Sequence, residues 1–243
     1  MNSNNLPSEI KSQAIDYVAA GAKSVLGAIP FAGSLLVELA GTIIPNQRIE
    51  RIANFAAALE DRIRHLEESE IIAELSDETF NELIEEALRQ AARSTSQERR
   101  NYLASLVASS LTDDQITNNE HRHLLRLLGE ISDVEVVWLR SLVGSYIGES
   151  DNFRRTHETT LAPVRAYLGS RQDELDKHTL QQSYISHLIT LGLAKRPLKL
   201  DKNKQPQVDS STKDFAYEST SITPLGRMLL RTLDLWPEHE DAG

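Results

Sequence analysis

Polar and cationic side chains in the last third of the chain are of types suited to contact with nucleic acid. The alternative interpretation is a solvated hairpin on a protein-interaction domain. Five cations within ten residues can pair with phosphates: Lys195, Arg196, Lys199, Lys202 and Lys204. The helix expected before them carries amides and a hydroxyl that can bond to base edges: Gln181, Gln182 and Ser186. No Arg or Lys lies between Lys177 and Lys195, so this helix lacks the side chains that most often bind guanine.

The sequence contains no recognisable catalytic, cofactor or metal motif. It has no cysteine, which excludes thiol catalysis, cysteine-ligated zinc, iron–sulfur clusters and disulfides. Glu120 and His123 have the spacing of half a di-iron motif, but no second copy occurs. A capping glutamate beside two surface histidines, His121 and His123, is the simpler interpretation. Arg171 and His178 would support a ribonuclease only if both faced a shared cleft. We therefore predict a non-enzymatic protein without cofactor, metal or small-molecule substrate.

An apolar N-terminal segment is the other candidate for binding. From Ser24 to Gln47 the only charged residue is Glu38. Pro30 and neighbouring glycines divide the segment into a helical hairpin at about 8–45, whose helices are too short to span a bilayer. The side chains expected to contact a membrane surface or a protein partner are Val25, Leu26, Ile29, Phe31, Leu35, Leu36, Leu39 and Ile43. The alternative interpretation is that this hairpin is buried in the core of a helical bundle.

Apolar periodicity and capping motifs predict the helices of the first half. Six apolar positions with spacings of three and four predict a helix over 46–69, as an intramolecular core or a dimer seam: Ile49, Ile52, Ala56, Leu59, Ile63 and Leu66. The next helices are expected at 77–93, 96–111, 117–131 and 132–147. Their expected caps are Ser76, Thr95, Thr117 and Ser132, the last three as capping boxes with a glutamate three residues later.

The remaining elements are expected in the order of a winged helix-turn-helix. They are a polar loop at 148–160, a short helix at 161–168, a helix at 179–191, strands at 193–200 and 215–222, and a last helix from Pro224. Gly192 is expected to end the helix before the hairpin in a left-handed conformation. Gly226 is expected to let the last helix pack closely against the hairpin.

Composition divides the chain into two modules. The 243 residues carry a net charge of −10, with −8 in residues 1–118 and −2 in the rest, which also holds eight of the thirteen aromatics. We predict a mainly α fold, with an N-terminal helical bundle at 1–116, a winged helix-turn-helix-like α+β domain with one β-hairpin at 117–236, and a frayed acidic tail at 237–243. No signal peptide is visible, so a cytoplasmic location is expected, with membrane association as an alternative.

Motifs along most of the chain resemble a bacterial family. They are the Ala/Gly-rich apolar start, the segment Ile43-Ile-Pro-Asn-Gln-Arg-Ile-Glu-Arg-Ile52, a helical middle, and Ser132-Asp-Val-Glu-Val-Val-Trp-Leu139 leading into the winged-helix-like end. This arrangement resembles the abortive-infection alpha family. The resemblance implies a role in phage defence, as a toxic or partner-binding element, and it assigns no active-site residue.

Two functions of different classes stay open. The first is a non-enzymatic phage-defence protein that acts through its apolar N-terminal hairpin on a protein or a membrane surface. The second is a transcriptional regulator that dimerises through its helical half and binds DNA through its winged helix. The expected partner is a protein or a second copy of the chain, with a membrane surface and DNA as alternatives.

Overall fold

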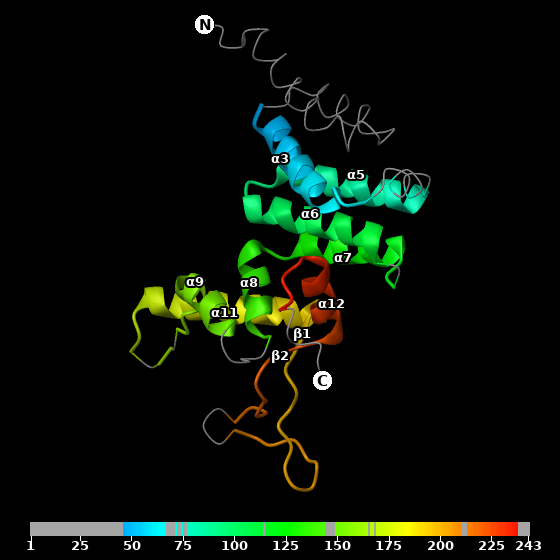
Figure 1. Cartoon of the computed structure of the whole chain (residues 1–243). Coiled ribbons are helices and arrows are strands. Elements are labelled where there is room, and N and C mark those ends of the chain that lie inside the picture. The colour runs from blue at the N-terminus through cyan, green and yellow to red at the C-terminus, as the bar shows by residue number, and fades with distance from the viewer. Residues whose placement is uncertain are drawn as a thin grey trace, which may run out of the picture. The chain divides into compact units, whose positions relative to one another are not determined.

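The computed structural model describes residues 46–66, 71, 74, 77–113, 115–143, 149–164, 166–167, 169–209 and 213–237 (Figure 1). The apolar hairpin predicted at about 8–45, with its eight candidate side chains, lies outside the described residues. So do residues 238–243 of the predicted tail. The described part is mainly helical and has a small antiparallel sheet near the C-terminus, which confirms the predicted fold class.

The described residues form two compact units. The first runs to Gly129 and includes Thr232–Asp234, and the second comprises Glu130–Arg231 and the residues from Leu235. The helix expected at 117–131 therefore lies almost wholly in the first unit, whereas the composition shift suggested a boundary before it.

The first unit is built around helix α3 (Asn46–Ile63), which packs against α5 (Glu78–Arg93) and α6 (Gln97–Thr112). Ile52, Ala56 and Leu59 of the predicted stripe are buried. The stripe is therefore part of an intramolecular core, the first of the two interpretations offered by its spacing. The helix ends at Ile63, earlier than predicted.

Side-chain caps explain where the next helices begin. Asp77 accepts a hydrogen bond from the backbone N–H of Thr79 (2.7 Å) and begins α5, one residue after the expected Ser76. Ser96 accepts one from the N–H of Arg99 (3.1 Å) and begins α6. The prediction of Thr95 as the α6 cap was wrong, because the neighbouring hydroxyl is the one whose backbone lies directly before the first helical turn.

A capping box begins α7 (Asn118–Glu130) as predicted. The N–H of Thr117 donates to Oε2 of Glu120 (2.7 Å), and the N–H of Glu120 donates to Oγ1 of Thr117 (3.4 Å). His121, expected at the surface, is fully buried, whereas His123 is exposed. Burial lowers the pKa of His121, and its Nδ1 donates to the carbonyl of Thr117 (3.2 Å).

The second unit begins with α8 (Asp133–Ser141), started by the predicted capping box of Ser132 and Glu135. Two short helices, α9 (Glu149–Thr156) and α10 (Glu158–Leu161), occupy the segment predicted as a loop. The loop prediction rested on polarity alone. The polar α9 carries one aromatic anchor, Phe153, whose ring lies 5.2 Å from the guanidinium of Arg140 on α8.

The helix expected at 161–168 is absent, because the described residues of that range are not helical beyond Leu161. Pro163 explains this difference, since a residue before proline disfavours the helical conformation, and Ala162 is accordingly extended (ψ 117°). Helix α11 (Gln172–Thr190) begins seven residues earlier than predicted. Asp173 and Glu174 lie in its first turn, where the helix dipole favours negative charge.

The two strands of the hairpin after α11 are shorter than predicted. Strand β1 (Ala194–Lys195) pairs with β2 (Ser221–Ile222), and the other described residues of the hairpin form only isolated bridges. Pro197 contributes to this difference, because it has no N–H to continue the ladder. Gly192 has the predicted left-handed conformation (φ 72°).

The last helix, α12 (Pro224–Thr232), packs tightly on the base of the hairpin. A Cβ atom at Gly226 would overlap the carbonyl oxygen of Leu193 and lie 2.8 Å from Cγ1 of Ile222. Gly226 therefore allows the close packing that the sequence predicted.

Candidate binding surfaces

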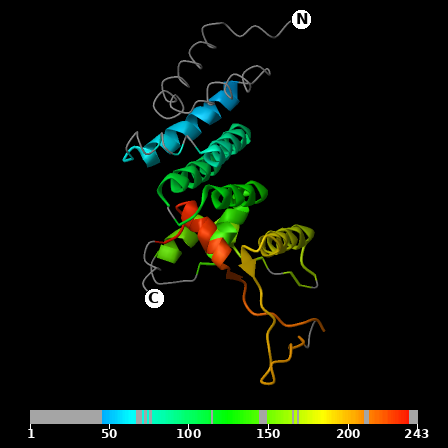
Figure 2. The same cartoon turned by 90° about the vertical axis from the view of Figure 1, so that its right-hand side faces the viewer.

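The five predicted cations all lie exposed on one projection, which we call the hairpin arm (described residues 195–209 and 213–218). Both Figures 1 and 2 show the arm extending away from α11 and α12 of its own unit. The guanidinium of Arg196 lies 5.3 Å from the centre of the Tyr217 ring. Lys213, which is not among the five predicted cations, is also exposed there.

Three extended segments of the arm are joined by a closed ring of backbone hydrogen bonds. The N–H of Lys199 donates to the carbonyl of Ala216 (2.9 Å), and the N–H of Ala216 donates to the carbonyl of Gln207 (2.8 Å). The N–H of Gln207 then donates to the carbonyl of Lys199 (2.8 Å). Gln207, which lies between the two strands predicted at 193–200 and 215–222, is thus hydrogen-bonded to a residue of each.

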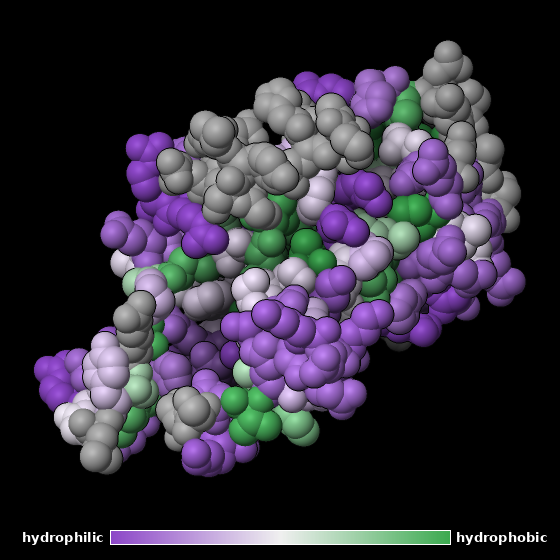
Figure 3. All heavy atoms as spheres, turned by 90° about the horizontal axis from the view of Figure 1, so that it is seen from below, coloured by the Kyte–Doolittle hydropathy of each residue, from purple (hydrophilic) through white to green (hydrophobic). Residues whose placement is uncertain are grey.

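Large apolar side chains on the arm are exposed, although none of them was predicted to lie at the surface. They are Leu198, Leu200, Val208, Phe215 and Tyr217, with exposed fractions between 37% and 57%. Figure 3, which views the molecule from below, shows hydrophobic residues at the surface among hydrophilic ones. These residues can be recognised in the sequence, because apolar residues occur there at alternate positions. Such alternation normally predicts a strand with one face buried, so it does not predict their exposure.

The three predicted contacts on α11 have different environments. Gln182 and Ser186 are exposed. Gln181 is engaged at both ends of its amide, because its Nε2 donates to the carbonyl of Ala162 (2.8 Å) and its Oε1 accepts from the N–H of Val164 (3.1 Å). Gln181 thus holds the chain before α11 in place and would have to release it to contact a base.

The residues of the ribonuclease hypothesis each have a local partner. Nδ1 of His178 lies 2.8 Å from the carbonyl oxygen of Val164. Nη2 of Arg171 lies 2.7 Å from Oδ2 of Asp173, and this ion pair is exposed. The two side chains are thus engaged in holding the start of α11 and the segment before it.

A carboxylate and a histidine far apart in the sequence meet inside the second unit. Oε1 of Glu135 lies 2.6 Å from Nδ1 of His187, and Oε2 accepts from the N–H (2.7 Å) and the hydroxyl (2.8 Å) of Ser132. Burial of Glu135 by itself raises its pKa, but the hydrogen bonds from Ser132 and His187 outweigh burial and lower the pKa overall. The pair joins the start of α8 to α11, and no local pattern in the sequence predicts it.

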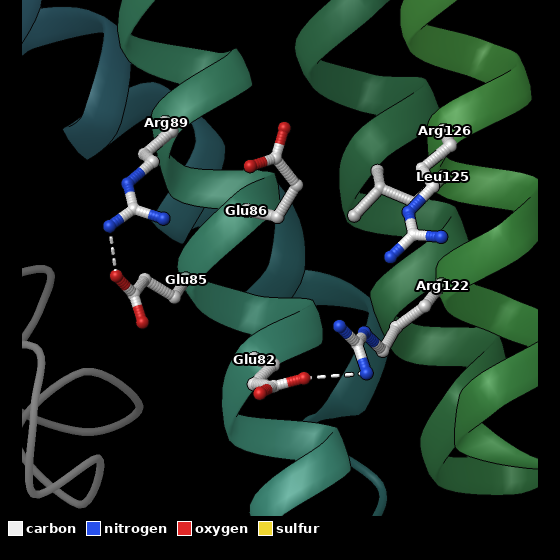
Figure 4. A pocket seen from close by; sticks show the side chains of 7 residues that line it. All are labelled: Glu82, Glu85, Glu86, Arg89, Arg122, Leu125 and Arg126. Carbon is white, nitrogen blue, oxygen red and sulfur yellow. Dashed lines mark hydrogen bonds and ion pairs between the residues drawn. The ribbon is translucent and has the colours of Figure 1, made fainter.

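A charged groove of about 500 Å³ lies between α5 and α7 in the first unit (Figure 4). It is lined by Glu82, Glu85, Glu86, Arg89, Arg122, Leu125 and Arg126. Nη1 of Arg122 lies 2.5 Å from Oε2 of Glu82 and joins the two helices, while Arg89 pairs with Glu85 along α5. The groove is therefore a place of charge pairing between helices.

The described residues hold no group of three or more metal-ligating side chains placed to bind an ion. Within the same parts of the chain, no helix has both the length and the apolar character that crossing a bilayer requires.

Comparison with known proteins identifies a family that the chain matches. No curated protein and no solved structure is detectably similar to the chain. The family model described as abortive infection alpha matches residues 47–233, well over half of the chain and both compact units. The chain therefore belongs to the abortive infection alpha family.

Proposed function

We propose that this protein defends bacteria against phage by binding a cellular surface through its apolar N-terminal segment, without catalysing a reaction. The observation that carries the proposal is the family match over residues 47–233. The sequence supports the mode of action, because a segment with the single charge Glu38 between Ser24 and Gln47 can bind a membrane surface or an apolar protein surface. The exposed apolar side chains of the hairpin arm also suit binding.

Phage challenge of cells that express the full chain tests this function. We expect fewer plaques than in cells without the gene, and death of infected cells before phage release at high multiplicity of infection. The double substitution Leu35→Glu and Leu39→Glu is expected to abolish protection at equal protein levels. Ser24→Glu and Gln47→Glu at the polar ends of the segment form the matched control and should retain it. Full protection by the Leu35 and Leu39 variant would refute the role of the apolar segment.

A DNA-binding regulator is the second candidate function. It is favoured by the five exposed cations of the hairpin arm together with the exposed Gln182 and Ser186 on α11. Selection from a random duplex library, followed by gel-shift assays, is expected to identify a preferred site. Lys199→Glu, Lys202→Glu and Lys204→Glu combined are expected to abolish binding. Retention of binding by this variant would contradict the hypothesis.

A further inference from the structure

The exposed apolar side chains of the hairpin arm form one continuous surface. Three antiparallel bridges pair Leu198 with Tyr217, Leu200 with Pro206 and Val208 with Phe215. Residues opposed in such a bridge point to the same side, and so do residues two apart in an extended segment. The pattern therefore places six side chains on one side of the arm, and we call them the apolar ring: Leu198, Leu200, Pro206, Val208, Phe215 and Tyr217.

The backbone hydrogen bonds show that the bridged residues are non-hydrogen-bonded pairs, the kind of antiparallel pair in which the side chains lie closer together. The bonds from Lys199 to Ala216 and from Glu218 to Pro197 flank the Leu198–Tyr217 pair and do not join its two members. In such a non-hydrogen-bonded pair the two Cα atoms approach to about 4.5 Å, so the side chains pack against each other. The apolar ring is thus an ordered surface of contiguous side chains, although most of its members are about half exposed.

The charge of the arm indicates an anionic occupant. Residues 195–218 carry six cations and four carboxylates, a net charge of +2, in a chain whose net charge is −10. One of those carboxylates, Asp201, is turned to the backbone, since its Oδ1 accepts from the N–H groups of Asn203 and Gln205 (2.8 Å each). An anionic surface is therefore attracted to the arm and repelled by the rest of the chain.

The apolar chemistry favours lipid over nucleic acid. Single-stranded nucleic acid binds to such surfaces by stacking its bases on aromatic rings, and only Phe215 and Tyr217 could serve. Leu198, Leu200 and Val208 are aliphatic and have no ring on which a base can stack. Aliphatic side chains flanked by lysines are suited to the interface of a bilayer, where the lysine stems lie along the apolar region and the ammonium groups reach the phosphates.

We propose that the hairpin arm docks on an anionic phospholipid surface, with the apolar ring in the interface and the surrounding lysines at the headgroups. This contact involves other residues than the N-terminal segment of the proposed function, so different substitutions test the two. The two contacts can therefore be tested independently.

A fluorescent label on the apolar ring tests the proposal in the full chain. The sequence has no cysteine, so Val208→Cys gives one labelling site, and Val208 is 57% exposed. Leu180→Cys on α11, where Leu180 is 53% exposed, is the matched control outside the arm. With an environment-sensitive dye, we expect vesicles of phosphatidylcholine and phosphatidylglycerol to brighten and blue-shift the label at position 208 and to leave the label at 180 unchanged.

A charge-neutral variant supplies a second measurement by vesicle flotation. Leu200→Ser with Phe215→Ser is expected to lower partitioning onto the anionic vesicles about tenfold. Val134→Ser with Leu180→Ser, at exposed apolar positions outside the arm, should leave it unchanged. Vesicles of phosphatidylcholine alone should bind the unaltered chain more weakly.

Three results would overturn the proposal. Flotation without any response of the label at position 208 would place the membrane contact elsewhere, and the N-terminal variant of the phage assay would then be the one to examine. A response at 208 to a single-stranded oligonucleotide but not to vesicles would identify nucleic acid as the occupant. If the fluorescence of the label at 208 changes with neither vesicles nor the oligonucleotide, the apolar ring docks on neither.

Discussion

Glu135 shows how one side chain can hold two distant parts of the second unit together. Its carboxylate caps the first turn of α8 and contacts His187, which lies 52 positions further along the chain. The side chain of Glu135 is 8% exposed, so its charge is tolerated only because each oxygen has a partner. Removal of this carboxylate should therefore destabilise the folded protein.

Glu135→Gln is expected to destabilise the chain by about 1.5–3 kcal/mol at pH 7, the usual range for a hydrogen bond to a charged group. The native structure lowers the pKa of Glu135, so the unfolded chain binds a proton more readily. The stability supplied by the carboxylate is thus present above the ordinary value of 4.5 and is lost as the pH falls through the lowered pKa. Urea unfolding of both proteins at decreasing pH measures this convergence.

The exposed Glu130→Gln is the control, and we expect little change in stability at any pH. A difference between Glu135→Gln and the unaltered chain that stays constant from pH 7 to well below 4.5 would contradict the assignment.

At the scale of elements, the contact between α12 and the base of the hairpin arm depends on one missing methyl group. The atom that a Cβ at Gly226 would overlap is a backbone carbonyl oxygen, that of Leu193, which cannot rotate away. The same carbonyl accepts hydrogen bonds from the N–H (3.1 Å) and the hydroxyl (3.0 Å) of Thr223. Any shift that relieves the overlap therefore strains the start of α12 as well.

Gly226→Ala is expected to destabilise the second unit by about 1–3 kcal/mol, the usual cost of overpacking. Gly129→Ala is the control in another helix, where the new Cβ would meet only the flexible side chain of Gln90. There the better helix propensity of alanine should leave stability equal or raise it by up to about 1 kcal/mol. Thermal unfolding followed by circular dichroism compares the two variants. Equal midpoints would refute the tight contact at Gly226.

At the scale of the whole molecule, negative charge and exposed apolar surface act against each other. A net charge of −10 keeps copies of the chain apart at neutral pH, while the apolar ring offers a surface on which copies can associate. The balance should shift as the pH approaches the isoelectric point of about 5.2, where the net repulsion vanishes.

Light scattering during a pH titration is expected to peak near pH 5.2. The variant with Leu200→Ser and Phe215→Ser keeps the charge of the chain unchanged and should scatter less at that pH. The matched variant with Val134→Ser and Leu180→Ser should behave like the unaltered chain. Equal scattering by all three proteins would show that association does not involve the apolar ring.

Local patterns in the sequence were sufficient to predict most of the helices and, to within a residue or two, where those helices begin. The spacing of Ile52, Ala56 and Leu59 predicted the buried stripe of α3, because the helical period alone puts these positions on one face. The boxes at Thr117 and Ser132 were confirmed, because a cap and its glutamate are three residues apart and need no distant partner. Gly192 and Gly226 were likewise predicted from local conformation and the need for close packing.

Only the tertiary structure decided which polar groups are buried and which apolar groups are exposed. His121 is buried and Glu135 meets His187, because burial and pairing depend on residues far away in the sequence. The apolar residues of the hairpin arm alternate like those of a half-buried strand, yet they are exposed, since no other described element covers them. Periodicity specifies a common face, but the partner that covers this face, or its absence, is set by the packing of the whole chain.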